Sequence, residues 1–265
     1  MKQLVYFIAF SCLFTSCSFT EEISFKEDGS GEFLLNYDMS QVMTTLEEMG
    51  MEQKKDTSEV QKKKQKMDST IYFKDVLVEK ADSIAKLPQE EQDMLKSLEP
   101  IVMKMKMDEE AGDMNFGFGA GFTSIDELPE VLNKIEQAKK LNSQRNPQYS
   151  KMDNSAFSKA TESSLENVDF KFDGKTFSRH INPNYKTSKE SLEALDTEMN
   201  QMGGMKEMFE SMSYTLLYHF PKKIASVSNT NATISNDGKT VTLKVNFMDM
   251  VNDPKLMALD VVLED

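Results

Sequence analysis

The sequence has 265 residues, a formal net charge of −13 and 39% hydrophobic side chains, enough for one sizeable core. The acidic balance excludes nucleic acid as a partner, because its binding needs a surface rich in lysine and arginine. It also disfavours electrostatic binding to anionic lipids. The chain has 20 methionines, no tryptophan and 2 cysteines, Cys12 and Cys17. If the chain is cut before Cys17 and the sulfur of Cys17 is acylated, no disulfide can form, and the fold must be stabilised by packing alone.

The first 16 residues have the layout of a secretory signal, with Lys2 followed by an apolar run over residues 4–14. That run is about half the ~20 residues that a transmembrane helix needs. It ends in Phe-Thr-Ser-Cys at residues 14–17, which resembles the lipobox of bacterial lipoprotein precursors. The alternative is an ordinary signal peptide with an incidental cysteine. We predict that residues 1–16 are a lipoprotein signal peptide and that Cys17 is acylated.

Acylation of Cys17 would determine how the mature chain is held in the cell. Two or more acyl chains bind a membrane firmly, at ~0.8 kcal/mol per buried methylene. Removal of residues 1–16 also removes Lys2, the one charged side chain there, which changes the net charge from −13 to −14. We expect residues 17–21 to form a tether. The acidic pair Glu21-Glu22 resembles the export signal of Bacteroidetes-type surface lipoproteins, or is part of a solvated tether.

Residues 22–265 are predicted to form a single domain, which opens with a hairpin. Apolar side chains alternate in residues 23–25 and 33–37 on either side of a glycine-rich turn. A helical pattern follows over residues 39–49, and residues 51–67 are mostly charged, which indicates a solvated insert.

The next segments alternate between strands and helices. A short strand at residues 71–73 precedes a helix over 76–87 and a further helical segment that begins at Pro88. Residues 103–107 and 114–122 alternate strictly, which predicts a hairpin with one buried face of Met, Phe and Ala and with glycines that leave room for another backbone. Ser124 and Glu127 form a capping box at the start of a helix.

The polar residues 142–167 are predicted to form a loop. A hairpin at residues 168–177 and a helix from about Ser188, kinked at Gly203-Gly204, come next. The strands expected last span residues 214–220, 241–247 and 259–263. Together these patterns predict an α+β fold, in which an antiparallel sheet is built from successive β-hairpins and helices pack on one face.

Catalytic and metal-binding patterns are absent from the sequence. The two histidines, His180 and His219, have no partner at a metal-ligand spacing, and no nucleophile motif or phosphate-binding loop occurs. The thioethers of residues 103–107 could bind Cu(I), but their alternation equally describes a core lining. We therefore predict no cofactor, no metal and no enzymatic activity.

Methionine-rich segments suggest an adaptable apolar surface that encloses an apolar ligand or contacts a partner. The alternative is a core in which Met replaces Leu. The predicted apolar face consists of seven residues: Met103, Met105, Met107, Phe116, Phe118, Met199 and Met202.

The C-terminal block resembles a known family. Residues 221–224, 226–229, 231–233, 237–241 and 262–265 are similar to uncharacterised Bacteroidetes-type lipoproteins, as are residues 71–75 and the opening hairpin. A remoter resemblance is to the LppM-type lipoprotein domain, an α+β fold sometimes linked with lipid-like ligands. The resemblance implies a lipoprotein and carries over no catalytic residue.

We therefore expect a lipoprotein of the cell envelope, held in the outer membrane by its acyl anchor, that binds an envelope protein or an apolar ligand. The alternative is a carboxylate-dependent hydrolase that acts on glycans. Such an enzyme needs two carboxyl groups about 5–10 Å apart in a cleft.

Overall fold

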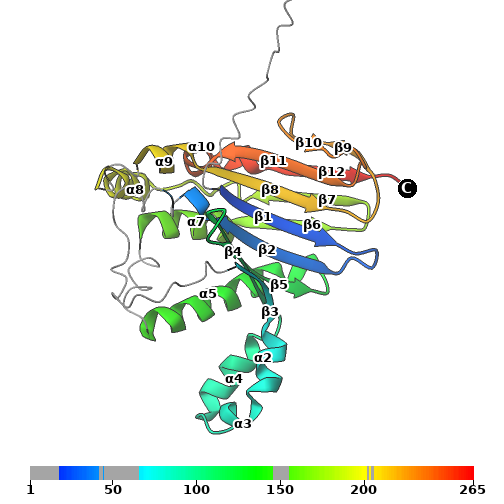
Figure 1. Cartoon of the computed structure of the whole chain (residues 1–265). Coiled ribbons are helices and arrows are strands. Elements are labelled where there is room, and N and C mark those ends of the chain that lie inside the picture. Colours follow the sequence, from blue (N-terminus) through cyan, green and yellow to red (C-terminus); the bar gives the residue numbers. More distant parts are fainter. Residues whose placement is uncertain (1–17, 42–43, 45–65, 146–154, 202, 204–205) are drawn as a thin grey trace, which may run out of the picture.

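The computed structural model describes residues 18–41, 44, 66–145, 155–201, 203 and 206–265. The described strands form an eight-stranded sheet in the order β10-β11-β8-β1-β2-β5-β4-β3 and a four-stranded sheet in the order β6-β7-β12-β9 (Figure 1). Their bounds are β1 Ser18–Phe25, β2 Gly31–Asp38, β3 Lys66–Tyr72, β4 Ile101–Asp108, β5 Asp113–Phe122, β6 Val168–Phe172, β7 Thr176–Ile181, β8 Ser213–His219, β9 Ile224–Val227, β10 Thr233–Ile234, β11 Thr240–Asn246 and β12 Leu259–Leu263.

The helices fall into two groups. Three short helices between β3 and β4 form an arm that projects from the body of the molecule, whereas the others lie beside the sheets (Figure 1). The arm consists of α2 Phe73–Glu79, α3 Ala81–Ile84 and α4 Gln89–Ser97. The others are η1 Ile125–Glu127, α5 Leu128–Arg145, α7 Ala156–Glu166, α8 Lys189–Gln201, α9 Lys206–Ser211, α10 Phe247–Asn252 and η3 Pro254–Met257.

The predicted α+β class is confirmed, and so are the hairpins β1–β2, β4–β5 and β6–β7. The strands divide between two sheets, and one pairing is parallel: β1 lies between its hairpin partner β2 and the distant strand β8. Local alternation marks strands but does not specify partners that are far apart in the sequence, so this pairing was not predicted.

The main core lies between the two sheets. Alternate side chains of β1 are buried, and Phe25 packs edge-on against Phe177 of the smaller sheet, with 5.5 Å between the ring centroids. Phe177 in turn contacts Tyr218 of β8 at 5.1 Å. Because β7 also alternates, its Phe177, Arg179 and Ile181 all point into this core. No helix among the described residues is long and apolar enough to cross a membrane.

The predicted tether was wrong for residues 18–21, which form the first half of β1. Phe19 and Glu21 are buried there, and these residues pair with both β2 and β8. The alternation of Phe19, Glu21 and Ile23 was the available signal, but a carboxylate at a core position hid it. Glu21 is therefore inside the domain, and only Glu22 of the acidic pair reaches solvent.

Two other segments also differ from the prediction. Ala156–Glu166, expected in a loop, form α7, which Ser155 caps by accepting a hydrogen bond from the Ser158 amide at 3.0 Å. Alanine, serine and threonine bury little apolar surface, so the helical period was weak. Residues 146–154 of that predicted loop, 51–65 of the predicted insert and most of the predicted helix 39–49 lie outside the described residues, and Lys66 and Met67 begin β3.

The remaining helices mostly follow the predicted patterns. The capping box is displaced by one residue: Ser124 accepts from the Asp126 amide at 3.3 Å, and Glu127 accepts from the Thr123 amide at 3.0 Å. The helix expected over residues 76–87 is divided into α2 and α3 at Lys80, and the long helix after Ser188 is divided into α8 and α9, with Gly203 at a φ of 57° between them.

Candidate functional site

Strands β3, β4 and β5 carry a group of apolar side chains on one face of the large sheet, interrupted on β3 by Ser69, which pairs with Met105. Met103 pairs with Phe118, Met105 with Phe116 and Met107 with Met114 across β4 and β5, and β3 adds Ile71 beside Met103 and Met67 beside Met107. Side chains that pair directly across a ladder lie on the same face. We call these eight residues the Met-rich face: Met67, Ile71, Met103, Met105, Met107, Met114, Phe116 and Phe118.

The Met-rich face is the continuation of the main core's inner face. Phe118 pairs with Leu35 of β2, which pairs with the buried Glu21 of β1, and Phe116 pairs with Tyr37. The same face of one sheet therefore lines the main core at β1 and becomes the Met-rich face at β3.

Helix α5 covers this face in part. Val131 and Ile135 of α5 are buried against Ile101 and Ala120, and Met103 and Phe118 pack against that small cluster. Met105, Met107, Met114 and Phe116 remain half-buried, and at the sheet edge Met67 and Ile71 are 39% and 40% exposed. The prediction of one buried face was therefore wrong in its degree of burial, because the second sheet does not extend over these strands.

The two methionines of the predicted apolar face that lie on the later helix do not join this surface. Met199 of α8 is buried in the main core, in the cluster that contains the side chains of β1 and β8. Met202 lies outside the described residues. Helical spacing correctly gave α8 an apolar side, but only the tertiary fold determines which core that side enters.

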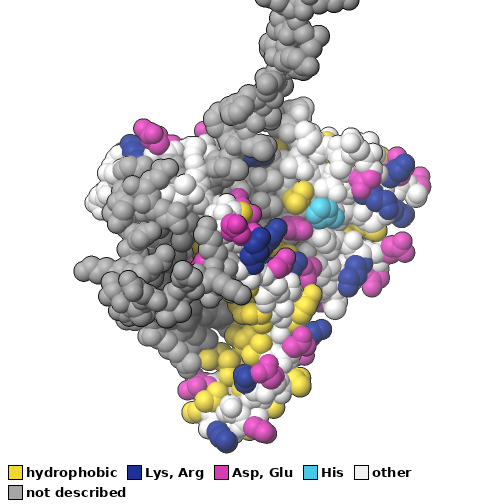
Figure 2. Space-filling model, in the orientation of Figure 1, with side chains coloured by type: hydrophobic (Ala, Val, Ile, Leu, Met, Phe, Trp, Pro, Cys, Tyr) yellow, Lys and Arg dark blue, Asp and Glu magenta, His cyan; other side chains and the backbone are white. Residues whose placement is uncertain are grey.

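Exposed apolar side chains gather near the Met-rich face. Among the described residues, four of the six exposed large hydrophobic side chains lie between positions 67 and 78, and Val78 on α2 is 78% exposed. Figure 2 shows hydrophobic side chains together in the lower half of the view, over β3 and the arm. Helices α2, α3 and α4 contain no buried residue. Such a concentration is typical of an interaction surface rather than of scattered surface residues.

The main core contains a buried ion pair that the sequence did not reveal. Arg179 of β7 donates from Nε to Oε1 of Glu21 at 3.0 Å and from Nη2 to Oε2 at 2.9 Å, which joins the two sheets. Tyr214 donates its hydroxyl to Oε2 at 2.9 Å, and Tyr218 donates to Oε1. The Arg179 Nη1 also donates to the carbonyl of Met257 at 3.2 Å.

The network satisfies its charges within the core. Burial alone would lower the pKa of the Arg179 guanidinium, but the charge and hydrogen bonds of Glu21, together with Tyr218 and Tyr214, outweigh that effect and hold the pKa above its usual value. Burial raises the pKa of Tyr214 and Tyr218 well above 10, and the negative charge of Glu21 raises it further. Because every member is buried and paired, this network stabilises the fold and does not offer a free carboxylate for catalysis.

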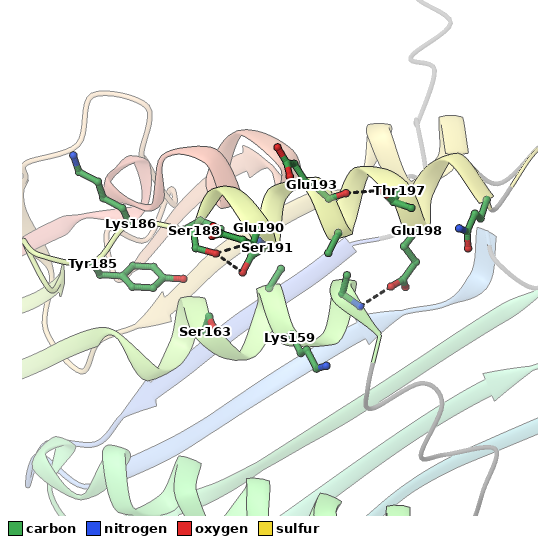
Figure 3. Close-up of a pocket in the computed structure, with 15 residues that line it drawn as sticks. Lys159, Ser163, Tyr185, Lys186, Ser188, Glu190, Ser191, Glu193, Thr197 and Glu198 are labelled. Carbon is green, nitrogen blue, oxygen red and sulfur yellow. Dashed lines mark hydrogen bonds between the residues drawn. The ribbon is translucent and has the colours of Figure 1, made fainter.

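A groove of about 810 Å³ lies between α7 and α8, with Tyr185 at one end (Figure 3). Its carboxylates are Glu190, Glu193 and Glu198, all from α8. Glu198 accepts a hydrogen bond from the Ala156 amide at 2.5 Å, at the start of α7, and Glu193 is 3.5 Å from Lys189. The groove is open and lined mainly by serine, threonine, alanine and lysine side chains. None of the Met-rich face lines it.

A second hollow of about 470 Å³ lies near the turn between β1 and β2, and its lining includes Lys26, Glu32, Lys74 and Glu99. It also contains no residue of the Met-rich face. The methionines of β4 thus belong to an open face and do not line either hollow.

The histidines lie on strand surfaces. The ring Nδ1 of His219 is 3.0 Å from Oγ1 of Thr240, and its Nε2 is 3.5 Å from Oε1 of Glu22. His180 lies 2.8 Å from Asp260. Among the described residues, no group of three or more His, Cys, Asp or Glu side chains is arranged to hold a metal ion.

Comparison with known proteins gives one structural similarity. No family model and no curated protein matches the chain. The chain is similar to the folded domain of the Mycobacterium tuberculosis lipoprotein LppM, solved by NMR, over 94% of this chain and 91% of that one, with a TM-score of 0.34 and 8% sequence identity. A similarity at this TM-score and identity does not transfer a ligand or an activity.

Proposed function

We propose that this chain is a lipoprotein of the cell envelope, anchored in the outer membrane through Cys17, that acts by binding and not by catalysis. The anchor is supported by the Phe-Thr-Ser-Cys motif that ends the apolar run. The outer membrane is supported by the resemblance of the C-terminal block to Bacteroidetes-type lipoproteins.

The structure adds a geometric consequence of that anchor. Strand β1 begins at Ser18, so the acylated residue would directly precede a strand in the interior of the large sheet. The register places Ser18 level with Asp38 of β2 and Asn115 of β5. The arm begins after Tyr72, which the pairings through Val102 and Gly119 place level with Glu22, four residues farther along β1. The anchor would therefore precede an interior strand, whereas the arm follows the edge strand β3, four strands away in the sheet.

The observation that carries the binding role is the incomplete covering of the Met-rich face. Its side chains are in register across three strands, yet Met67 and Ile71 are exposed and the other six are only half-buried. Methionine is flexible and polarizable, so such a face adapts to the shape of an apolar partner. We infer that a partner covers this face in the cell and that burial of its side chains stabilises the complex by about 25 cal/mol per Å² of apolar surface.

Metabolic labelling with an alkyne fatty acid tests the anchor. We expect the full chain to incorporate the label and to fractionate with membranes, and Cys17→Ala to lose both properties. Cys12→Ala is the matched control, because Cys12 lies within the apolar run and should leave the labelling unchanged. Equal labelling of Cys17→Ala and the parent chain would contradict the proposed anchor.

Binding of a neutral solvatochromic dye tests the face. We expect the dye's fluorescence to rise with the native protein, and the double variant Met105→Asp, Phe116→Ser to abolish most of the rise. Ile234→Asp is the control, because Ile234 is as exposed (41%) as Ile71 of the Met-rich face (40%) but lies on β10 at the other edge of the sheet. An unchanged signal in the double variant would exclude the Met-rich face as the apolar binding surface.

A further inference from the structure

Strand β3 is the outermost strand of the large sheet and pairs only with β4, so its other side has no strand partner in the described part of the chain. An unpaired edge presents a row of free amide and carbonyl groups to any strand that can align with it. Natural edges are usually protected by proline, bulges or several charges. Lys66–Tyr72 contains no proline, pairs with β4 without a register shift, and has only two charged residues, Lys66 and Asp68.

The pattern of side chains along β3 is self-complementary. Ser69 is its central residue, and the two exposed apolar residues of the Met-rich face, Met67 and Ile71, lie two positions before and two positions after it. If a second β3 runs antiparallel about a two-fold axis at Ser69, each Met67 lies opposite the other copy's Ile71. Apolar pairs directly opposite in an antiparallel ladder are stabilising.

The other face of β3 is compatible with the same register. Lys66 would lie opposite Tyr72, and Asp68 opposite Thr70, so no like charges are directly opposed. Lys66 is already 2.8 Å from Asp108 of β4, which leaves its positive charge partly compensated. A register moved by one residue would place Met67 and Ile71 opposite polar side chains and on the wrong face.

From this symmetry we propose that β3 pairs with β3 of a second copy of this chain, in an antiparallel ladder centred on Ser69. The pairing joins the two large sheets and extends the Met-rich face from one copy to the other. Because the two copies are related by a two-fold axis, each contributes the same surface to the contact, and the assembly is a closed dimer. The proposal goes beyond the binding role of the Met-rich face, because the second copy pairs beside that face at the sheet edge and does not cover it.

Cysteine cross-linking in membranes tests the register. Two residues on the axis of an antiparallel ladder have Cα atoms about 4.5–5.5 Å apart, within the range of a disulfide. We therefore expect mild oxidation of membranes containing Ser69→Cys to give a dimer on a non-reducing gel. Thr70→Cys is the matched control: its side chain lies on the opposite face and its symmetry mate is displaced along the strand, so its dimer yield should be at least fivefold lower.

Oxidation of the unsubstituted parent chain distinguishes failure of the acyl anchor at Cys17 from failure of the β3 pairing. If Cys17 is acylated, the mature parent has no free thiol and gives no dimer, whereas cross-linking of the parent would show a free Cys17 and contradict the anchor rather than the pairing. Absence of a dimer with Ser69→Cys, or equal yields at positions 69 and 70, would overturn the pairing and leave the anchor unaffected.

A second pair of variants tests the apolar contact. In the Ser69→Cys background, Ile71→Lys should lower the dimer yield at least fivefold, because it places an ammonium group opposite the other copy's Met67. Val78→Lys should not lower the yield, because Val78 is more exposed than Ile71 but lies on α2, away from the strand. Equal loss in both variants would show that the cross-link does not arise from the proposed ladder.

Discussion

The two halves of one sheet face differ in what covers them. At β1 and β8 the inner face is closed by the four-stranded sheet, and its side chains, including an ion pair, are fully buried. At β4 and β3 the same face is covered only in part by α5, and its methionines are half-buried or exposed. We call these the covered half and the open half. In both halves alternate side chains point to this face, so burial is decided by the covering layer and not by the strands themselves.

The two halves also differ in which side chains they carry on this face. The covered half tolerates Glu21 because Arg179, Tyr214 and Tyr218 surround its carboxylate. The open half carries flexible methionines. A methionine that is only partly packed loses less side-chain entropy than one that is fully buried. The covered half therefore behaves as a core, and we expect the open half to behave as a binding surface.

The largest effect is expected from breaking the ion pair of the covered half. Arg179→Met leaves the Glu21 carboxylate buried without a cation, which should lower the free energy of unfolding by about 3–5 kcal/mol. Urea unfolding followed by circular dichroism measures this change. The double variant Glu21→Gln, Arg179→Met should recover part of the loss, because no unpaired charge remains. A loss below about 1 kcal/mol in Arg179→Met would contradict the role of the pair.

Truncation of one apolar side chain in each half compares them directly. Leu216 of β8 is fully buried, so Leu216→Ala should lower the free energy of unfolding by about 2–5 kcal/mol through lost burial and the cavity left behind. Met105→Ala in the open half should cost about 1 kcal/mol or less, because its side chain already contacts solvent. Similar costs for the two variants would mean that the open half is covered in solution.

The boundary between the halves is the pairing of β2 with β5, where Gly119 is essential. A Cβ added there would lie 1.8 Å from the carbonyl oxygen of Phe33, so the backbone must move, and Gly119→Ala should cost about 1–3 kcal/mol. Gly121→Ala is the matched control two residues along the same strand, where the nearest atom is 3.8 Å away, and it should change stability by about 0.5 kcal/mol or less. Thermal unfolding of both variants checks the contrast.

Alkaline pH should weaken the covered half gradually. The pKa of Tyr214 and of Tyr218 is raised in the fold, so both phenols stay protonated while those of the unfolded chain ionise near pH 10. Above pH 10 the unfolded state binds fewer protons, so the free energy of unfolding falls, by about 1 kcal/mol per pH unit for each tyrosine. Urea titrations from pH 9 to 11 measure the slope, and Tyr218→Phe should make it shallower. A stability independent of pH over this range would contradict the buried network.

Much of the local structure could be predicted from sequence. Strict alternation marked β4 and β5, glycine-rich turns marked the hairpins, and the Ser124–Glu127 pair marked the start of the helix that becomes α5. The missed segments were those in which a polar residue occupies a core position or a helix has little apolar surface. Glu21 hid the start of β1, and the serines and threonine of α7 hid that helix.

The sequence by itself determined the α+β class, the hairpins and the apolar sides of the helices, because these depend on periods of two and of 3.6 residues along the chain. Only the tertiary structure decided that β1 lies beside β8, that Arg179 meets Glu21 across 158 positions, and that Met199 enters the main core while Met105 does not. Those relations depend on which distant layers come together, and a local period contains no information about them.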